Sequence, residues 1–163
     1  MSKILFLDYD GVLHPGHGWF ANGEFQLVND DEYDESLSLF CWVPILEKIL
    51  YEVDPERQID IVLSTSWGHS TNWRDAAKRL SPALQSRVIG GTTGYPQPRG
   101  RQIEMYIEDM RLGDSHWIAL DDDDYFWPPR ILDKLVHADR GLGLSEEAVQ
   151  QQLRDKLKEL LLL

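Results

Sequence analysis

The sequence predicts an α/β fold in which a doubly wound parallel sheet lies between two layers of helices, a three-layer arrangement. Short, almost wholly apolar runs of strand length alternate with longer segments of helical periodicity, which is typical of right-handed β–α–β crossovers. Such runs suit strands that are buried on both faces of a parallel sheet. Three of them are followed directly by Asp or Ser: Ile4–Leu7, Ile59–Leu63 and Trp117–Leu120.

The length of 163 residues predicts one domain, residues 1–163, with a buried core. No run of eighteen apolar residues is present, so no membrane span is expected. The chain begins directly with a strand and lacks a signal-peptide pattern, which favours a cytoplasmic location. The single cysteine, Cys41, excludes an internal disulfide, and its apolar neighbours favour a packing role over a nucleophilic one.

The formal net charge of −12 argues against broad, nonspecific binding to nucleic acid. The charge is unevenly distributed, however. Residues 63–113 hold seven basic and four acidic side chains, so an anion site is expected in this part of the chain.

The first strand is expected to end at Leu7 or Asp8, because Asp and Gly are poor strand residues. Asp8 and Asp10 then lie at the carboxyl end of a central strand, where open α/β sheets bind their ligands. Two neighbouring carboxylates raise each other's pKa unless a cation lies between them, and hard oxygen ligands favour Mg²⁺. The competing interpretation is an ordinary turn, which Asp-Gly pairs often mark.

Residues 14–35 are rich in glycine and have little helical periodicity. They are predicted to form a small loop or hairpin insertion, with strands at Gly18–Phe20 and Glu24–Val28 across the turn pair Asn22-Gly23. The insertion is too short to be a separate domain.

The rest of the chain is predicted to alternate between helices and strands. Helices are expected at Ser36–Val53 (with a kink or break at Pro44), Asn72–Leu80, Arg101–Leu112 and from Ser145 onward. Strands are expected at Ile59–Leu63, Arg87–Ile89, Trp117–Leu120 and Leu135–Ala138, with a loop at Gly90–Gly100. The last helix should bury Val149, Leu153, Leu157 and Leu160.

Four short motifs, in order along the chain, resemble those of the haloacid dehalogenase-like (HAD) hydrolases. They are the segment Asp8-Tyr9-Asp10-Gly11 after the first strand, Ile61–Ser64, a basic residue (Arg99 or Arg101) near the start of a helix, and Trp117–Asp122. The basic motif residue is usually lysine in that family, and arginine differs from it in shape and bonding.

Within that superfamily, the segments VLSTSW and RGRQIE and the run of aspartates resemble the HAD domain of Swiss Army Knife RNA repair proteins. The resemblance implies a HAD-like Rossmannoid fold with a minimal cap or none. It also implies a site without a large lid, which suits bulky substrates better than small metabolites.

The resemblance implies a role for each motif residue. Asp8 would be the nucleophile that forms an aspartyl-phosphate, and Asp10 would be the general acid and base. Phosphate would be bound by hydroxyls and a guanidinium: Ser64, Thr65, and Arg99 or Arg101. Mg²⁺ would be held by Asp8, the backbone carbonyl of Asp10, and Asp121 with Asp122 or Asp123.

The sequence therefore predicts a magnesium-dependent phosphohydrolase whose partner is a phosphorylated substrate, with an RNA or DNA end or a nucleotide favoured by the resemblance. The alternatives are a catalytically silent HAD-fold binding or accessory module, and a phosphotransferase of the same chemistry. His14, Trp19, Phe20 and Trp67 are candidates for substrate contact near the site, with loop or core packing as the competing role.

Overall fold

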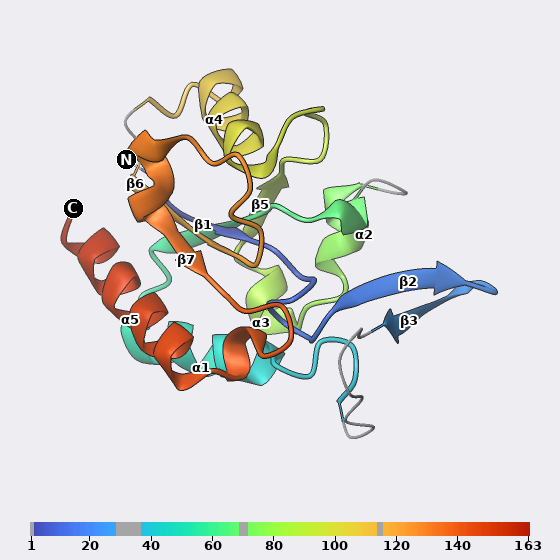
Figure 1. Cartoon of the computed structure of the whole chain (residues 1–163). Helices are drawn as coiled ribbons and strands as arrows, with labels where there is room; N and C mark the ends of the chain where they lie inside the picture. The colour runs from blue at the N-terminus through green and yellow to red at the C-terminus, as the bar shows by residue number, and fades with distance from the viewer. Residues whose placement is uncertain (1, 29–36, 69–71, 114–115) are drawn as a thin grey trace.

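The computed structural model describes residues 2–28, 37–68, 72–113 and 116–163, and it contains a five-stranded sheet in the order β5-β4-β1-β6-β7. All neighbouring strands in this sheet are parallel. The strands are β1 (Lys3–Leu7), β4 (Ile59–Leu63), β5 (Val88–Gly91), β6 (His116–Asp121) and β7 (Leu135–His137). The predicted α/β fold class is confirmed (Figure 1).

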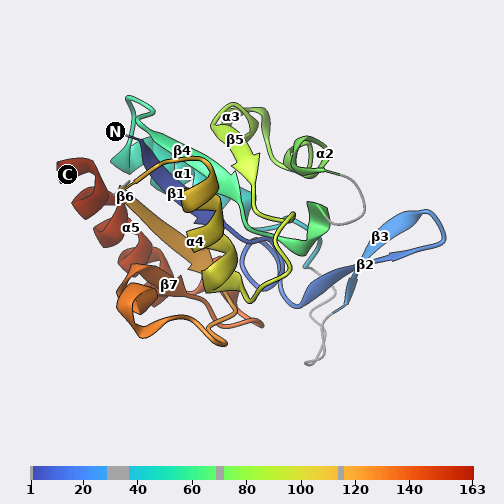
Figure 2. The same cartoon turned by 90° about the horizontal axis from the view of Figure 1, so that it is seen from above.

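Helices cover both faces of the sheet (Figures 1 and 2). The α-helices are α1 (Val43–Val53), α2 (Trp73–Ala77), α3 (Pro82–Gln85), α4 (Arg99–Asp109) and α5 (Glu147–Leu162). Three 3₁₀ turns are η1 (Ser66–Gly68), η2 (Pro129–Lys134) and η3 (Gly143–Ser145). None of the helices in the described ranges has the length and hydropathy needed to cross a bilayer.

The alternation of side chains along β1 divides the core into two layers. Leu5 and Leu7 join a cluster with residues from α1, α2, α3 and α5 on one face, whereas Ile4 and Phe6 join a cluster with α4 and η2 on the other. Phe6 packs edge-on against Tyr106 of α4, with 5.8 Å between ring centroids. All four predicted residues of α5 are buried: Val149, Leu153, Leu157 and Leu160.

The strand register aligns the ends of the three central strands. Leu7 of β1 pairs with Leu63 of β4 on one side and with Leu120 of β6 on the other. After β5, α4 carries the chain back across the sheet to β6, on the far side of β1. This reversal makes the carboxyl end of β1 a topological switch point, which is where such sheets bind ligands.

The predicted hairpin is confirmed as a two-stranded antiparallel ribbon, β2 (His17–Ala21) with β3 (Glu24–Val28). Its turn residues Asn22 and Gly23 have φ angles of 53° and 81°, the left-handed conformation that a two-residue hairpin turn requires. The ribbon extends away from the sheet (Figure 1).

Helix α1 begins at Val43, so the prediction of a helix from Ser36 was wrong at its start. Phe40 has a φ of 59°, which interrupts any helix there. Pro44 lies in the first turn of α1, where its missing N–H is harmless, and it is not a kink. Ser36 and the acidic residues before it lie outside the described residues.

The predicted loop at residues 90–100 was too long at both ends. Gly90 and Gly91 belong to β5, and α4 begins at Arg99 rather than at Arg101. Glycine is rare in strands, but here an added Cβ at Gly90 would lie 2.3 Å from the Tyr106 hydroxyl. Packing of α4 against the sheet therefore leaves no room for a side chain at Gly90.

Candidate active site

Three carboxylates gather at the carboxyl end of β1 and β6. Asp8 follows β1, Asp121 ends β6 and Asp122 comes next, and an oxygen of each lies within 4.8 Å of the others. The Asp8 N–H donates to the Leu120 carbonyl at 3.1 Å, so strand pairing sets the spacing of the two segments. Asp8 and Asp121 are buried.

Gly11 allows this close approach. The chain turns sharply after Asp8, with the N–H groups of Val12 and Leu13 both donating to the Tyr9 carbonyl, and Gly11 has a φ of +70°. A Cβ at this position would lie 2.3 Å from Asp122 Oδ2. Both the backbone conformation and the neighbouring carboxylate therefore require glycine after Asp10.

Arg99 is the cation of this cluster. Its Nε lies 3.2 Å from Asp121 Oδ2 and its Nη2 lies 3.7 Å from Asp8 Oδ1. Its Nη1 also donates to the backbone carbonyl of Ser64. These contacts place the guanidinium between the ends of β1, β4 and β6.

Arg101 lies elsewhere. Its Nη1 contacts two carboxylates of its own helix, at 3.3 Å from Glu104 and 3.1 Å from Glu108. Successive residues of an α-helix are about 100° apart, so positions 99 and 101 project in nearly opposite directions. Only one of the two arginines can therefore reach the end of the sheet.

Burial and crowding raise the pKa values of all three clustered carboxyls. Burial raises the pKa of Asp8 well above its ordinary range, and the charge of Asp121 raises it further while Arg99 opposes both effects. Burial likewise raises the pKa of Asp121 to about 7, against the opposing charge of Arg99. The pKa of Asp122 is also raised, chiefly by burial. Among the described residues, Arg99 opposes the charge of all three carboxylates and Arg140 opposes that of Asp122, so negative charge is left unbalanced.

This donor set fits a hard divalent cation. Asp121 Oδ2 is buried and receives no hydrogen bond from the described residues, although Arg99 lies at ion-pair distance. An oxygen in this state is stabilised by a cation, and three carboxylates are ligands that Mg²⁺ prefers. Asp8, Asp121 and Asp122 are the side chains that would hold it.

Hydroxyl groups line the β4 and β5 side of the cluster. Ser64 follows β4, its N–H donates to the Leu7 carbonyl at 2.8 Å, and its Oγ lies 3.4 Å from Arg99 Nη1. Thr92 follows β5, is fully buried, and donates from Oγ1 to Ser64 Oγ at 3.4 Å. Sequence reasoning missed Thr92, although a hydroxyl directly after a strand was the signal that identified Ser64.

Thr65 is buried beside Ser64, and its Oγ1 accepts a hydrogen bond from the Trp67 N–H at 3.4 Å. Together with Arg99 it lines a small polar cavity of about 160 Å³. The remaining lining residues come from η1, the segment before α4, α4 itself and the acidic loop: Ser66, Gln97, Pro98, Gln102 and Asp123.

Asp10 lies outside the carboxylate cluster and is held separately. Its Oδ1 accepts hydrogen bonds from His14 Nε2, Trp67 Nε1 and the Gly18 N–H, each at 2.9 Å. Burial acts to raise the pKa of Asp10, but these hydrogen bonds outweigh it and the pKa is lowered. Its side chain remains 21% exposed, so it is reachable from solvent.

The four other candidates divide into two groups. His14 and Trp67 are buried and bonded to Asp10, whereas Trp19 and Phe20 are about 60% exposed on the hairpin. Phe20 packs against Phe25, with ring centroids 5.1 Å apart. The exposed pair leaves aromatic surface open on the insertion.

The other aspartates of the acidic run have local roles. Asp123 donates its N–H to Asp121 Oδ1 at 3.0 Å, and its own Oδ1 accepts from the Tyr125 N–H at 2.8 Å. Asp124 is exposed and lies 4.0 Å from His137. These contacts shape the loop that carries Asp121 and Asp122.

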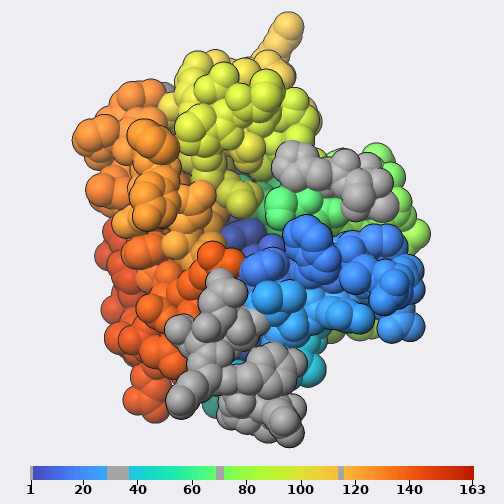
Figure 3. Space-filling view, turned by 45° about the vertical axis from the view of Figure 1, so that its right-hand side comes forward, coloured from blue at the N-terminus to red at the C-terminus, as the bar shows by residue number. Residues whose placement is uncertain are grey.

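The space-filling view shows a hollow in which the dark blue of the N-terminal segment is visible (Figure 3). Blue, yellow-green and orange segments surround it, which correspond to the hairpin region, the segment before α4 and the chain after β6 (Figure 3). The N-terminal segment, in which the Asp10 side chain is 21% exposed, therefore borders this hollow.

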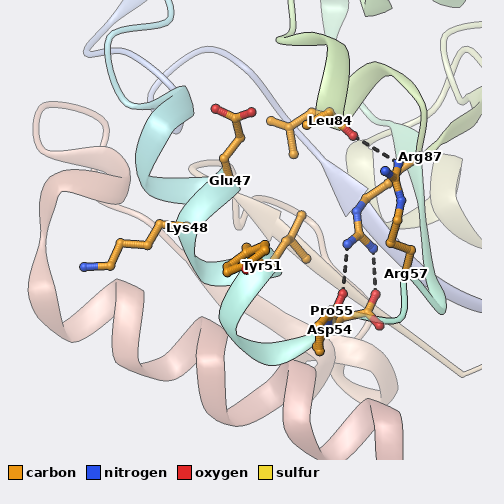
Figure 4. Close-up of a pocket in the computed structure, with 10 residues that line it drawn as sticks. Glu47, Lys48, Tyr51, Asp54, Pro55, Arg57, Leu84 and Arg87 are labelled. Atoms are coloured by element: carbon orange, nitrogen blue, oxygen red, sulfur yellow. Dashed lines mark hydrogen bonds and ion pairs between the residues drawn. The ribbon is translucent and has the colours of Figure 1, made fainter.

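A second pocket, of about 520 Å³, lies beside α1 and α3 (Figure 4). Its polar wall includes the buried pair Asp54 and Arg87, with Asp54 Oδ2 2.6 Å from Arg87 Nη1. These residues precede β4 and β5, so the pocket is at the opposite edge of the sheet from the aspartates. Asp54 and Arg87 are already paired with each other, and the pocket contains none of the predicted site residues.

The chain was compared with known protein families and with curated proteins. A model of the family described as "HAD domain in Swiss Army Knife RNA repair proteins" matches residues 4–149. This range includes β1 through the start of α5, and so every residue of the cluster. No curated protein matches the chain.

Proposed function

Since the chain belongs to the family of HAD domains in Swiss Army Knife RNA repair proteins, we propose that it is a magnesium-dependent phosphohydrolase. The observation that carries the proposal is the carboxylate cluster Asp8, Asp121 and Asp122 beside Arg99, with Asp10 held apart. Phosphoryl transfer depends mainly on positioning and on charge stabilisation, and this arrangement supplies both.

In the first step, an Asp8 carboxylate oxygen attacks phosphorus, and the bond from phosphorus to the leaving oxygen breaks. Asp10, which must be protonated for this step despite its lowered pKa, gives its proton to that leaving oxygen, so the product departs as a neutral alcohol. Ser64 and Arg99 donate hydrogen bonds to the phosphoryl oxygens during the transfer. A bound Mg²⁺ would neutralise negative charge on the phosphate and on the carboxylates.

In the second step, water attacks the phosphorus of the aspartyl-phosphate and Asp10 accepts a proton from that water. Phosphate leaves and the Asp8 carboxylate is restored. Asp10 thus returns to its protonated form, ready for another cycle.

We propose a terminal phosphate on a nucleic acid or a nucleotide as the substrate. The family's description concerns RNA repair. Trp19 and Phe20 follow Gly18, which bonds to Asp10, along the hairpin and offer exposed aromatic surface on which bases can stack. The net charge of −12 opposes long nucleic-acid contacts, so recognition of a short end is favoured.

The test is phosphate release from p-nitrophenyl phosphate, nucleotides and phosphorylated oligonucleotides, with Mg²⁺ and with EDTA. We expect Mg²⁺-dependent release that Asp8→Asn abolishes, because the amide is not a nucleophile of this kind. Asp124→Asn, in the same acidic run but exposed, is the matched control and should keep its rate.

Two outcomes would contradict the proposal. If the folded wild-type protein binds Mg²⁺ but releases no phosphate from any compound, the chain is a silent binding or accessory module. If phosphate passes to an added alcohol in preference to water, the chain is a phosphotransferase.

A further inference from the structure

We infer that His14, Trp67 and the backbone of Gly18 act together to fix one oxygen of Asp10, so that the other oxygen is presented to the leaving group. The inference rests on the proposed function, in which Asp10 is the acid and base. His14 and Trp67 are then positioning residues, because they act on substrate only through Asp10.

All three donors bind the same atom. His14 Nε2, Trp67 Nε1 and the Gly18 N–H each lie 2.9 Å from Asp10 Oδ1. Within the described ranges, no group donates a hydrogen bond to Asp10 Oδ2. Three donors from different directions prevent rotation of the carboxylate, and the proton-transfer role is left to Oδ2.

The tautomer of His14 is fixed from its other side. The Phe40 N–H donates to His14 Nδ1 at 3.2 Å, so in the neutral ring the proton is on Nε2, which donates to Asp10. His14 is fully buried and lies edge-on to the Phe40 ring, with centroids 5.0 Å apart. A buried ring with both nitrogens bonded has one orientation.

The indole of Trp67 is held by packing on its faces. Phe25 of the hairpin stacks on it, with centroids 4.0 Å apart and 21° between planes, and the Arg79 guanidinium lies 5.6 Å from its centroid. Gly18 lies against its edge, since an added Cβ would be 2.1 Å from Trp67 Cζ2. The hairpin therefore supplies one donor to Asp10 directly and supports another.

Such positioning has a chemical signature. Proton donation by Asp10 matters most when the leaving oxygen is strongly basic, and it matters little for a stable leaving group such as p-nitrophenolate. Loss of a positioning contact should therefore slow the hydrolysis of phenyl phosphate much more than that of p-nitrophenyl phosphate. A general loss of structure would slow both substrates by a similar factor.

The experiment measures kcat/KM for both substrates, with Mg²⁺, because kcat/KM reports the phosphorylation of Asp8 and excludes the shared second step. Trp67→Phe removes the N–H but keeps a ring for Phe25 to stack on. Trp117→Phe, at the opposite end of β6, is the matched control. His14→Ala removes the second donor, and His14→Gln replaces it with an amide N–H.

We expect Trp67→Phe and His14→Ala to lower kcat/KM for phenyl phosphate by roughly 10-fold or more, and that for p-nitrophenyl phosphate by less than about 3-fold. His14→Gln should recover most of the difference, and Trp117→Phe should leave the ratio of the two values at the wild-type level. Circular dichroism confirms that each variant is folded, and Trp67→Phe alone is sufficient if His14→Ala does not fold.

An unchanged ratio in folded Trp67→Phe, with an active wild type, would overturn this inference and leave the proposed function intact. An inactive wild type would overturn both together. The two failures are thus separated by the wild-type rate.

Discussion

Replacing Asp121 by Asn should stabilise the metal-free protein at neutral pH. The wild-type cluster places Asp8, Asp121 and Asp122 within 4.8 Å of one another, and Arg99 is the cation in contact with them among the described residues. Asparagine removes one negative charge, keeps the shape of the side chain, and can still accept the hydrogen bond from the Asp123 N–H.

The magnitude follows from the raised pKa. Burial raises the pKa of Asp121 from 3.8 to about 7, which corresponds to a ceiling of roughly 4 kcal/mol for keeping the group ionised. This value already includes the opposing charge of Arg99, at 3.2 Å. A buried amide without a full set of hydrogen bonds carries a cost of its own, so we expect about half of this ceiling. A gain of ~2 kcal/mol raises the Tm of a chain of this size by roughly 4–8 °C.

The pH dependence has a definite sign. A carboxyl whose folded pKa is raised makes the protein less stable as pH rises from about 4, its unfolded pKa, to about 7. The Tm advantage of Asp121→Asn in EDTA should therefore be largest near pH 8 and should shrink toward pH 5. The raised pKa values of Asp8 and Asp122 act in the same direction.

Thermal unfolding by circular dichroism, in EDTA and in Mg²⁺, tests this directly. Mg²⁺ at about 100 times its Kd should stabilise the wild type by ~2.7 kcal/mol, and it should stabilise Asp121→Asn much less. If the metal-free variant is less stable than the wild type at pH 8, or if its advantage is independent of pH, the cluster does not carry the proposed electrostatic strain.

The other predictions concern arginine contacts. Arg99→Ala should lower the steady-state hydrolysis rate by roughly 10²–10³-fold, as loss of a charge-stabilising group does. The rate of Arg101→Ala should remain within about twofold of the wild-type rate. Equal effects of the two substitutions would contradict the assignment of Arg99 to the site. Asp54→Asn should destabilise the protein by about 3–5 kcal/mol in urea, because it leaves buried Arg87 without its carboxylate (Figure 4). Burial acts to raise the pKa of Asp54, but its hydrogen bonds outweigh burial and lower that pKa. The free energy of unfolding of the wild type should therefore decrease as the pH is lowered below about 4, and that of Asp54→Asn should decrease less. Equal decreases in the two proteins would refute this prediction.

Much of the fold can be predicted from short stretches of sequence. The apolar run before Asp8 forms a strand because it is buried on both faces, and Asn22-Gly23 forms a turn because both residues tolerate positive φ. Both predictions depend on local residue patterns, and the structure confirms the strand and the turn. Helix α1 was misjudged at its start because Leu39 and Phe40 continue its apolar period, although the backbone at Phe40 is left-handed.

The parallel sheet also determines which side chains meet. Once β1, β4 and β6 are neighbours, the residues that follow them lie at one edge, so Asp8, Ser64 and Asp121 could be grouped from sequence. The choice between Arg99 and Arg101 could not be made in this way, because both lie near the start of one helix. It depends on which side of α4 packs toward the sheet.

The sequence by itself thus determined the strands, the hairpin and the carboxylates at the end of β1 and β6, since each depends on local residue patterns. Tertiary structure alone decided how Asp10 is held, because its donors His14, Gly18 and Trp67 come from three segments, and Trp67 is 57 residues away in sequence. No spacing rule connects Trp67 to Asp10. Their meeting follows from the packing of the hairpin against η1 beside the turn after β1.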